Sequence, residues 1–569
     1  MDVPKKWQVS EAAEKTLLPR GSASLLPLVL RIVSQRGIST HEALAAFLAP
    51  SFAALPDPFA MRGIDAAVER LVQAHGSGEI VCIYGDYDVD GISATALLVS
   101  FLQTCGFACR YFIPNRFDDG YGINGEAIRQ IADQGVSLLV SVDCGITAIE
   151  EARLCRALGL DLIITDHHQP KAELPEACAV INPLQPGCTY PFKSLAGVGV
   201  AFNLLVALRK TLREQGHFQD APEPDLRDWL DLVALGTIAD VVPLVDLNRL
   251  YASFGLRQLS QPTRLGIQAL KQVAGVDGTV SCGQVGFRLA PRLNAAGRLE
   301  SAVPGVELLL GTDPSACRRI AEELDRANAE RQQVERQIFD EAVALVESGG
   351  GVAGRFSIVL TSPTWHQGVV GIVASRLVER YHRPTILIAL GEDGTGKGSG
   401  RSITGFHLLE AIMACASNLE RFGGHRYAAG VSLKADRIEP FAADFEEAAS
   451  RCLTEADLLP RLTIDAEATP VEVTLELAQE LKRLEPFGMG NPEPVMMLRG
   501  MHVMDRRVVG GDHLRLRLAR DGHYFNAIAF RMALRDIPPV VDVAFYPELN
   551  EWNGSTTLQL RVKDLRSPE

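Results

Sequence analysis

Short apolar segments alternate with longer helical ones between about residue 61 and residue 260. Residues 80–84, 137–142 and 161–165 are rich in β-branched and apolar side chains and have the length of buried strands. Segments of helical length and character lie between them, the first of which begins at Gly91. Such alternation predicts a parallel sheet covered by helices. We therefore expect an α/β domain in this half of the chain.

Potential metal ligands follow each of these three strands. Aspartates stand after the first strand and an aspartate after the second, and an aspartate with two histidines follows the third: Asp86, Asp88 and Asp90; Asp143; Asp166, His167 and His168. The carboxyl ends of parallel strands meet at one edge of a sheet. Carboxylates so close together repel one another unless a cation lies between them, and Mg²⁺ and Mn²⁺ favour oxygen ligands. The pattern predicts a divalent-metal site.

Two other interpretations of the first aspartate cluster were weighed. An EF-hand loop begins with the same D-x-D-x-D-G pattern, but it needs a preceding helix and a glutamate at its twelfth position, where this chain has Leu97. An acidic turn that caps the following helix would account for Asp90, which could accept from free N–H groups there. It leaves Asp86 and Asp88 unexplained, so we favour metal binding.

Asp240 is a fourth candidate ligand. It lies within the apolar segment LGTIADVVPL, residues 235–244. Burying an unpaired carboxylate is costly, so Asp240 must meet either a metal or an arginine. We favour the metal, because the other ligands need a further group to close the site.

The middle of the chain carries arginines and one very long helix. Arg292 and Arg298 stand among small residues in a predicted loop at 289–299, where they suit either phosphate contacts or structural salt bridges. Asp313 as N-cap and Pro314 at N1 predict a helix to about residue 347, roughly 50 Å long. This helix is too polar for a core and is expected to bridge two domains. Asn328 and Arg331 lie on it and could equally be solvated.

Residues 352–459 are expected to form a second α/β domain. Strands are predicted at 356–360 and 384–390, with a helix between them that ends at Tyr381. A predicted glycine-rich loop then carries Ser399 and Arg401, and Gly424 and His425 belong to a second glycine-rich segment. Glycines let backbone N–H groups approach a phosphate, although the spacing is not that of a Walker A motif.

From about residue 460 the chain is rich in short strands and turns. Residues 499–535 contain eight arginines against three aspartates, interleaved with histidines and aromatic residues. A small barrel with basic strands and exposed aromatic faces is typical of OB-folds that bind single strands. The alternative is an ordinary β-domain with a solvated arginine face.

Composition limits the class of protein. A chain of 569 residues needs about three or four domains. A net charge of −14 argues against a nucleic-acid partner, but metal-binding carboxylates and charge segregation between domains weaken that argument. The eleven scattered cysteines indicate a reducing cytoplasm. We expect no membrane association, since the chain has neither an apolar run of eighteen residues nor a signal-peptide core.

Several motifs resemble those of the DHH phosphoesterase superfamily: D-Y-D-x-D-G, S-V-D-C-G, D-H-H and G-T-I-A-D-V-V-P-L. Two further motifs resemble those of the DHHA1 domain of that superfamily: S-G-R-S and G-G-H-x-x-A-A-G. The resemblance implies five metal ligands, with Asp88 bridging two ions: Asp86, Asp88, Asp143, His167 and Asp240. It also implies that His168 faces the scissile phosphate and that Asp166 orients the histidines. The implied substrate contacts are Arg292, Arg298, Asn328, Arg331, Ser399, Arg401, Gly424 and His425.

Tyr84-Gly85 stands where many pyrophosphatases of the superfamily have a histidine ligand, which favours its nuclease branch. The resemblance therefore implies a cytoplasmic, monomeric 5′→3′ exonuclease of DNA repair and recombination that acts on single-stranded DNA with two Mn²⁺ or Mg²⁺ ions. A single-stranded-DNA-binding protein and a helicase are its implied partners. The alternatives are a phosphodiesterase or pyrophosphatase of small nucleotides, which would not need residues 460–569, and a non-catalytic scaffold, which would have lost ligands.

The expected organisation is multidomain α/β. It comprises an N-terminal cap on the next domain (1–60), a parallel-sheet DHH domain (61–260), a connecting region (261–311), the interdomain helix (312–348), a DHHA1 domain (352–459) and an OB-like barrel (460–569).

Overall fold

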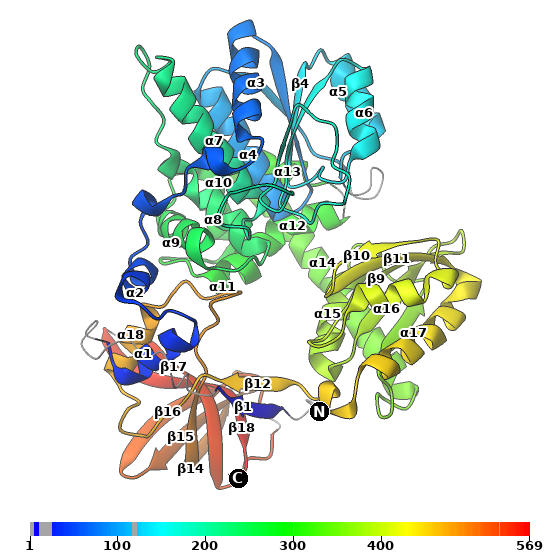
Figure 1. Cartoon of the computed structure of the whole chain (residues 1–569). Coiled ribbons are helices and arrows are strands. Elements are labelled where there is room, and N and C mark those ends of the chain that lie inside the picture. Colours follow the sequence, from blue (N-terminus) through cyan, green and yellow to red (C-terminus); the bar gives the residue numbers. More distant parts are fainter. Residues whose placement is uncertain are drawn as a thin grey trace. The chain divides into compact units, whose positions relative to one another are not determined.

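The computed structural model describes residues 5–10, 25–115, 122–299, 301–533, 535–552 and 554–568. It divides into two compact units (Figure 1). One unit contains Val9–Asp325 and Thr463–Glu569, and the other contains Met1–Gln8 and Arg326–Leu462.

A five-stranded parallel sheet organises the domain predicted at residues 61–260, in the order β3-β2-β4-β5-β6. The predicted strands are β2 (Ile80–Gly85), β4 (Leu138–Val142) and β5 (Asp161–Thr165), and all three are confirmed. The edge strands β3 (Ala108–Phe112) and β6 (Ala179–Ile181) were not predicted. β3 is half-exposed and contains an arginine, so it lacks the apolar pattern of a buried strand.

Alternate residues of this sheet pack against helices on its two faces. Val81 and Ile83 face α3 (Ile64–Ser77), α4 (Val89–Thr104) and α7 (Gly197–Glu214). Cys82 and Tyr84 face α5 (Gly125–Asp133) and α6 (Ile149–Ala157). Further helices share the hydrophobic core of α3, α4 and α7: α8 (Leu230–Ala239), α9 (Asp246–Ser260), α10 (Leu265–Ala274) and α13 (Val303–Leu310).

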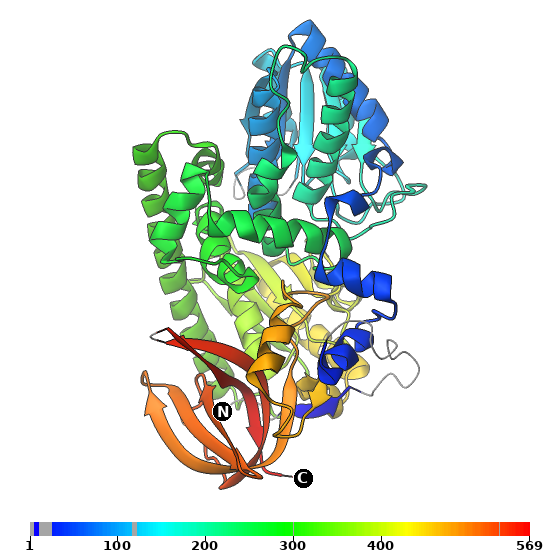
Figure 2. The same ribbon diagram turned by 90° about the vertical axis from the view of Figure 1, so that its left-hand side faces the viewer.

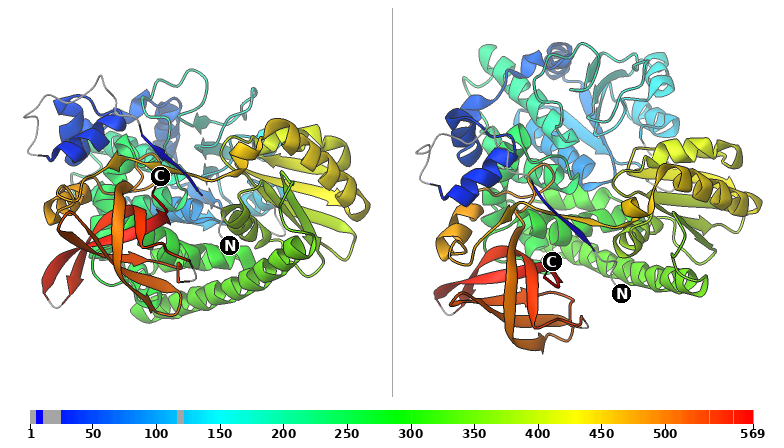
Figure 3. Two further views of the ribbon diagram at one scale, coloured as in Figure 1. Left: turned by 90° about the horizontal axis from the view of Figure 1, so that it is seen from below. Right: turned by 60° about the horizontal axis from the view of Figure 1, so that its bottom comes forward.

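The predicted arginine loop is a helix, which corrects that expectation. A π-helix, η4 (Val285–Leu289), leads directly into α12 (Ala290–Leu299). Helix α14 (Pro314–Ser348), a long green helix in Figure 3, follows as predicted. It has 35 residues, and the Asp313 side chain accepts from the Ala316 N–H at 2.7 Å. The boundary between the two units falls inside α14, which confirms that the helix connects them.

The second unit contains a five-stranded sheet in the order β10-β11-β9-β8-β7. β7 (Ile358–Ser362), α15 (Val370–Tyr381) and β8 (Thr385–Leu390) lie close to their predicted positions. The predicted glycine-rich loop is instead a strand, β9 (Thr395–Arg401), between β8 and β11 (Ala428–Lys434), while β10 (Arg421–Gly424) lies at the edge. A Cβ at Gly398 would lie 2.7 Å from a methyl of Val431, so close packing explains this glycine in a strand.

Six strands form the C-terminal β-domain: β13 (Ala466–Glu467), β14 (Met496–Val509), β15 (His513–Arg520), β16 (His523–Ala529), β17 (Val540–Trp552) and β18 (Ser555–Arg566). Pairing of β14 with both β15 and β17 closes the barrel. The expected barrel is confirmed.

The N-terminal helices complete the core of this barrel. Helices α1 (Pro27–Gln35) and α2 (His41–Leu48) share a hydrophobic core with α18 (Leu475–Lys482) and the strands (Figure 2). The Leu26 N–H donates to Glu480 at 2.6 Å. The later part of the predicted N-terminal cap contacts the domain at residues 61–260: Arg249 of α9 donates to the Phe47 carbonyl and lies over the Phe47 ring, and Phe52 and Phe59 pack against the core of that domain. Helix α1 packs into the barrel core instead, to which its apolar face is complementary.

All eleven cysteines are free thiols. None of the described helices has both the length and the apolar character that crossing a membrane requires.

Candidate metal centre

The five predicted metal ligands converge at the carboxyl edge of the parallel sheet. Asp86 and Asp88 follow β2, Asp143 follows β4 and His167 follows β5, while Asp240 is the C-cap of α8. Three groups in this region have ligand atoms within 4.8 Å of one another: Asp86, Asp88 and Asp143; Asp143, His167 and His168; Asp90, His167 and Asp240. The edge that the sequence pattern indicated is therefore also where the side chains meet.

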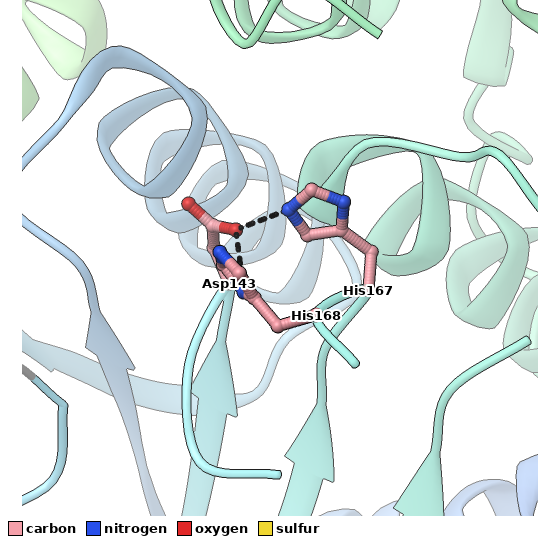
Figure 4. Close-up of side chains that lie close together, drawn as sticks. All are labelled: Asp143, His167 and His168. Carbon is pink, nitrogen blue, oxygen red and sulfur yellow. Dashed lines mark ion pairs between the residues drawn. The ribbon is translucent and has the colours of Figure 1, made fainter. Parts of the chain in front are cut away.

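Asp143 and His167 show best that these residues suit a cation. Asp143 Oδ1 lies 3.1 Å from His167 Nε2 and 4.0 Å from His168 Nδ1 (Figure 4). Both Asp143 Oδ1 and His167 Nε2 are buried, and neither has a hydrogen-bond partner within the described parts of the chain. Buried polar atoms are rarely left unsatisfied. A divalent cation between carboxylate oxygens and an imidazole nitrogen would satisfy both atoms.

The residue that caps α4 is Asp88, and not Asp90 as the sequence suggested. Asp88 is the N-cap of α4, and its Oδ1 accepts from the N–H groups of Asp90 and Gly91 at 2.9 and 3.2 Å. The fully buried Asp90 accepts instead from Gly197 and Val198 at the start of α7, at 2.6 and 2.9 Å. The expectation that Asp90 caps its own helix is wrong, because its side chain points away from α4 toward α7.

The Asp166 carboxylate contacts the imidazole ring of one histidine, His168. Its Oδ1 lies 2.8 Å from His168 Nδ1 and also accepts from the backbone N–H groups of His167 and His168. Its Oδ2 accepts from the Ile146 N–H at 2.9 Å. Asp166 therefore fixes the ring of His168 and the backbone of both histidines.

The clustered charges shift the pKa values of these groups. Burial, and then the charges of Asp90 and Asp88, raise the pKa of Asp240 to about 9, and burial followed by the neighbouring aspartates raises the pKa of Asp143 well above its usual range. Such carboxylates favour a bound cation, which relieves their repulsion. Burial and the charge of His168 lower the pKa of His167 to about 4, so His167 is neutral and able to ligate at pH 7.

His168 should make metal-free stability depend on pH. Burial alone would lower its pKa, but the hydrogen bond and charge of Asp166 outweigh burial and raise the pKa to about 9. A raised folded-state pKa stabilises the fold below the unfolded value of about 6.5, and this contribution disappears as the pH rises through about 9. We expect His168→Gln to destabilise the protein in EDTA by about 1–2 kcal/mol at pH 6 and by much less at pH 9.5. Urea unfolding at both pH values checks this, and an equal loss at both would contradict it.

The predicted substrate residues form separate groups. Arg292 on α12 pairs with Asp325 at 2.9 Å, which corresponds to the salt-bridge alternative. Arg331 and Asn328 are buried on α14, where Arg331 donates to Asn328 at 2.8 Å and to Glu335 at 2.6 Å. The two residues are therefore not solvated. Glu335 also accepts from Arg376, a residue that the sequence did not single out.

Ser399 and Arg401 lie together on β9. Arg401 Nη1 donates to Ser399 Oγ at 3.0 Å and to the Gly400 carbonyl at 2.8 Å. A Cβ at Gly371, in the first turn of α15, would lie 2.8 Å from Ser399 Oγ. Both side chains therefore lie against the N-terminal turn of a helix. Gly424 ends the exposed strand β10, and His425 follows it.

Three family models match successive parts of the chain. They are the DHH family, N-terminal domain, over residues 80–237, the DHHA1 domain over residues 354–451, and the RecJ OB domain over residues 464–564. Together with the aspartate and histidine cluster, these matches define a metal-dependent phosphoesterase of the DHH class.

Relatives that match nearly the whole of this chain identify one family within that class. The single-stranded-DNA-specific exonuclease RecJ of Escherichia coli is 38% identical, over 99% of this chain and 98% of that protein. RecJ of Bacillus subtilis is 41% identical, over 95% of this chain and 68% of that protein. The crystal structure of RecJ in complex with Mn²⁺ from Thermus thermophilus superposes on this chain with a TM-score of 0.85 and 32% sequence identity. The match covers 99% of this chain and 80% of that chain. The chain belongs to the RecJ family.

Proposed function

We propose that this protein degrades single-stranded DNA from the 5′ end by metal-dependent phosphodiester hydrolysis. The observation that supports it best is the buried pair of Asp143 Oδ1 and His167 Nε2, two ligand atoms 3.1 Å apart without a hydrogen-bond partner in the described chain. Relatives named single-stranded-DNA-specific exonuclease, and RecJ structures with Mn²⁺ and with Mg²⁺, support the same reaction and cofactor.

The direct test is digestion of single strands labelled at the 5′ or the 3′ end, with Mn²⁺ and with EDTA. We expect metal-dependent release of label from the 5′ end first. Activity that persists in EDTA would contradict the proposal.

Each group in the centre has a proposed role. Asp86, Asp88, Asp143, His167 and Asp240 would hold the cations, and Asp88 would be shared between two of them. Bound divalent cations supply Lewis acidity and a water nucleophile of lowered pKa. Asp166 keeps a proton on the ring of His168, so that this imidazolium can donate a hydrogen bond to a non-bridging phosphate oxygen.

The 5′ polarity rests on a proposed terminal-phosphate pocket at β9. The guanidinium of Arg401, the hydroxyl of Ser399 and the backbone N–H groups at the start of α15 can all donate to a phosphate dianion. Arg298, Arg331, Asn328, Gly424 and His425 are proposed to contact the rest of the strand.

The C-terminal barrel favours long strands over small nucleotides as substrate. Three arginines and an exposed tyrosine line a groove of about 370 Å³ on the barrel: Arg507, Arg515, Arg517 and Tyr524. The guanidinium of Arg517 lies 5.4 Å from the Tyr524 ring centroid. Guanidinium groups with aromatic rings suit the phosphates and bases of single strands.

Replacing both Arg515 and Arg517 by glutamate should weaken binding of a long single strand at least about tenfold and flatten its salt dependence. Cleavage of a dinucleotide should change little. The double substitution Arg437→Glu with Arg451→Glu, at exposed positions outside the barrel, is the charge-matched control. Fluorescence anisotropy at several salt concentrations measures the effect, and unchanged affinity would favour the small-nucleotide alternative. Deleting residues 460–569 is a poorer test, because it would expose the core that α1 shares with the barrel.

The partner proteins, the monomeric state and the cytoplasmic location remain predictions. Copurification with a single-stranded-DNA-binding protein or a helicase, and sedimentation of the purified chain, test the first two.

A further inference from the structure

Helix α12 lies directly against the aspartate loop after β2. The Val89 N–H, at the first position of α4, donates to Asn294 Oδ1 of α12 at 3.1 Å. One turn further along α12, a Cβ at Gly297 would lie 2.9 Å from the Tyr87 carbonyl oxygen, so the helix can approach only with glycine there. The residues on both sides of Asp88 are thus fixed by the same helix.

The hydrogen bond from Val89 to Asn294 completes the cap of α4. The first N–H groups of a helix have no partner within it. Here Asp88 Oδ1 accepts from the N–H groups of Asp90 and Gly91. Asn294 Oδ1 accepts from the N–H group of Val89, which precedes them. Without Asn294, the Val89 N–H would lie unsatisfied beside the Asp88 carboxylate and would compete for it.

We infer that Asn294 is a positioning residue, which holds the Asp88–Val89 peptide so that the Asp88 carboxylate stays directed at the cation. This inference rests on the proposed metal centre, and it assigns the segment containing Arg292 and Arg298 a function besides substrate contact. Groups that orient metal ligands typically change metal affinity by 10–100-fold when removed.

The donor can be removed independently of the acceptor. Proline at Val89 eliminates the N–H yet suits the first helical position, and Asp88 is already extended (φ −94°, ψ 177°), as a residue before proline must be. Val89→Ala keeps the N–H and measures the lost packing of this buried side chain alone.

The experiment measures Mn²⁺ binding to the full chain without DNA, by calorimetry and by the electron paramagnetic resonance signal of free Mn²⁺. We expect Asn294→Ala and Val89→Pro each to weaken Mn²⁺ binding about tenfold, and the double variant to be no weaker than either. Affinity for single strands in EDTA should stay within twofold of wild type.

Three outcomes would overturn the inference: additive losses in the double variant, an equal loss in Val89→Ala, or wild-type Mn²⁺ affinity in Asn294→Ala. Failure of the wild-type protein to bind Mn²⁺ would instead contradict the metal centre itself, so the two failures are distinguishable. Circular dichroism of each variant shows whether it is folded.

Discussion

Asp143→Asn is expected to lower the rate of single-strand cleavage at least about 10³-fold, because several kcal/mol of transition-state stabilisation disappear with a metal ligand. Asp143 belongs to two of the three ligand groups, so its loss affects the whole centre. The thermal stability of the metal-free protein, in contrast, should not fall. The raised pKa of this buried carboxyl means that its charge destabilises the metal-free fold at pH 7. The variant should therefore unfold in EDTA at the same or a higher temperature than wild type.

Asp88→Asn provides an independent test. Asparagine is as good an N-cap as aspartate, so the cap of α4 should persist while a charged ligand is lost. We expect the same loss of cleavage with single-strand binding largely retained. Asp133→Asn, exposed at the end of α5, is the matched control. Single-turnover cleavage and thermal unfolding are the measurements, and either active-site variant that cuts at more than a tenth of the wild-type rate would remove its residue from the proposed centre.

Arg401→Ala should raise the KM for 5′-phosphorylated strands by about 10–100-fold, the usual cost of losing charge-assisted hydrogen bonds. The KM for strands with a 5′ hydroxyl should change much less, so that the difference between the two substrates shrinks. The guanidinium is already oriented by Ser399 and the Gly400 carbonyl, which limits the entropy lost on binding a phosphate.

The control for this prediction is Lys397→Ala, which removes an exposed cation from the same strand. It should leave the preference for a 5′ phosphate unchanged. KM and kcat for both substrates on each variant decide the matter. Attack by the wild type at 3′ ends first, or equal slowing of both substrates in Arg401→Ala, would contradict end recognition at β9.

The sheet and its metal ligands could be predicted because their signals are local. Buried parallel strands such as β5 are continuous apolar segments, and a charged residue immediately after one must lie at the carboxyl edge. The apolar segment around Asp240 already favoured it as a ligand, and the resemblance to the DHH superfamily added the phosphoesterase chemistry. Sequence reasoning alone had left an arginine partner open for Asp240, and the structure brings its Oδ2 to 3.6 Å from His167 Nε2.

The errors arose where tertiary contacts override local preference. β9 is a strand although glycine is unfavourable there, since Ile388 and Val431 fill the space beside Gly398. The role of Asp90 depends on Gly197, which is 107 residues away along the chain, and the role of Asn294 depends on Val89, which is 205 residues away. No local pattern carries that information.

The packing of α1 into the barrel also determines the order of events during synthesis. Leu26 and Glu480, which bond to each other, are 454 positions apart, so a ribosome adding roughly 5–20 residues per second leaves α1 without its partner for about 20–90 s. During that interval the apolar face formed by Leu28, Val29 and Ile32 is exposed on the nascent chain. The barrel is therefore expected to mature after the domain at residues 61–260, and a premature stop within the codons for residues 466–566 would leave the hydrophobic surfaces of α1 and of the incomplete barrel exposed.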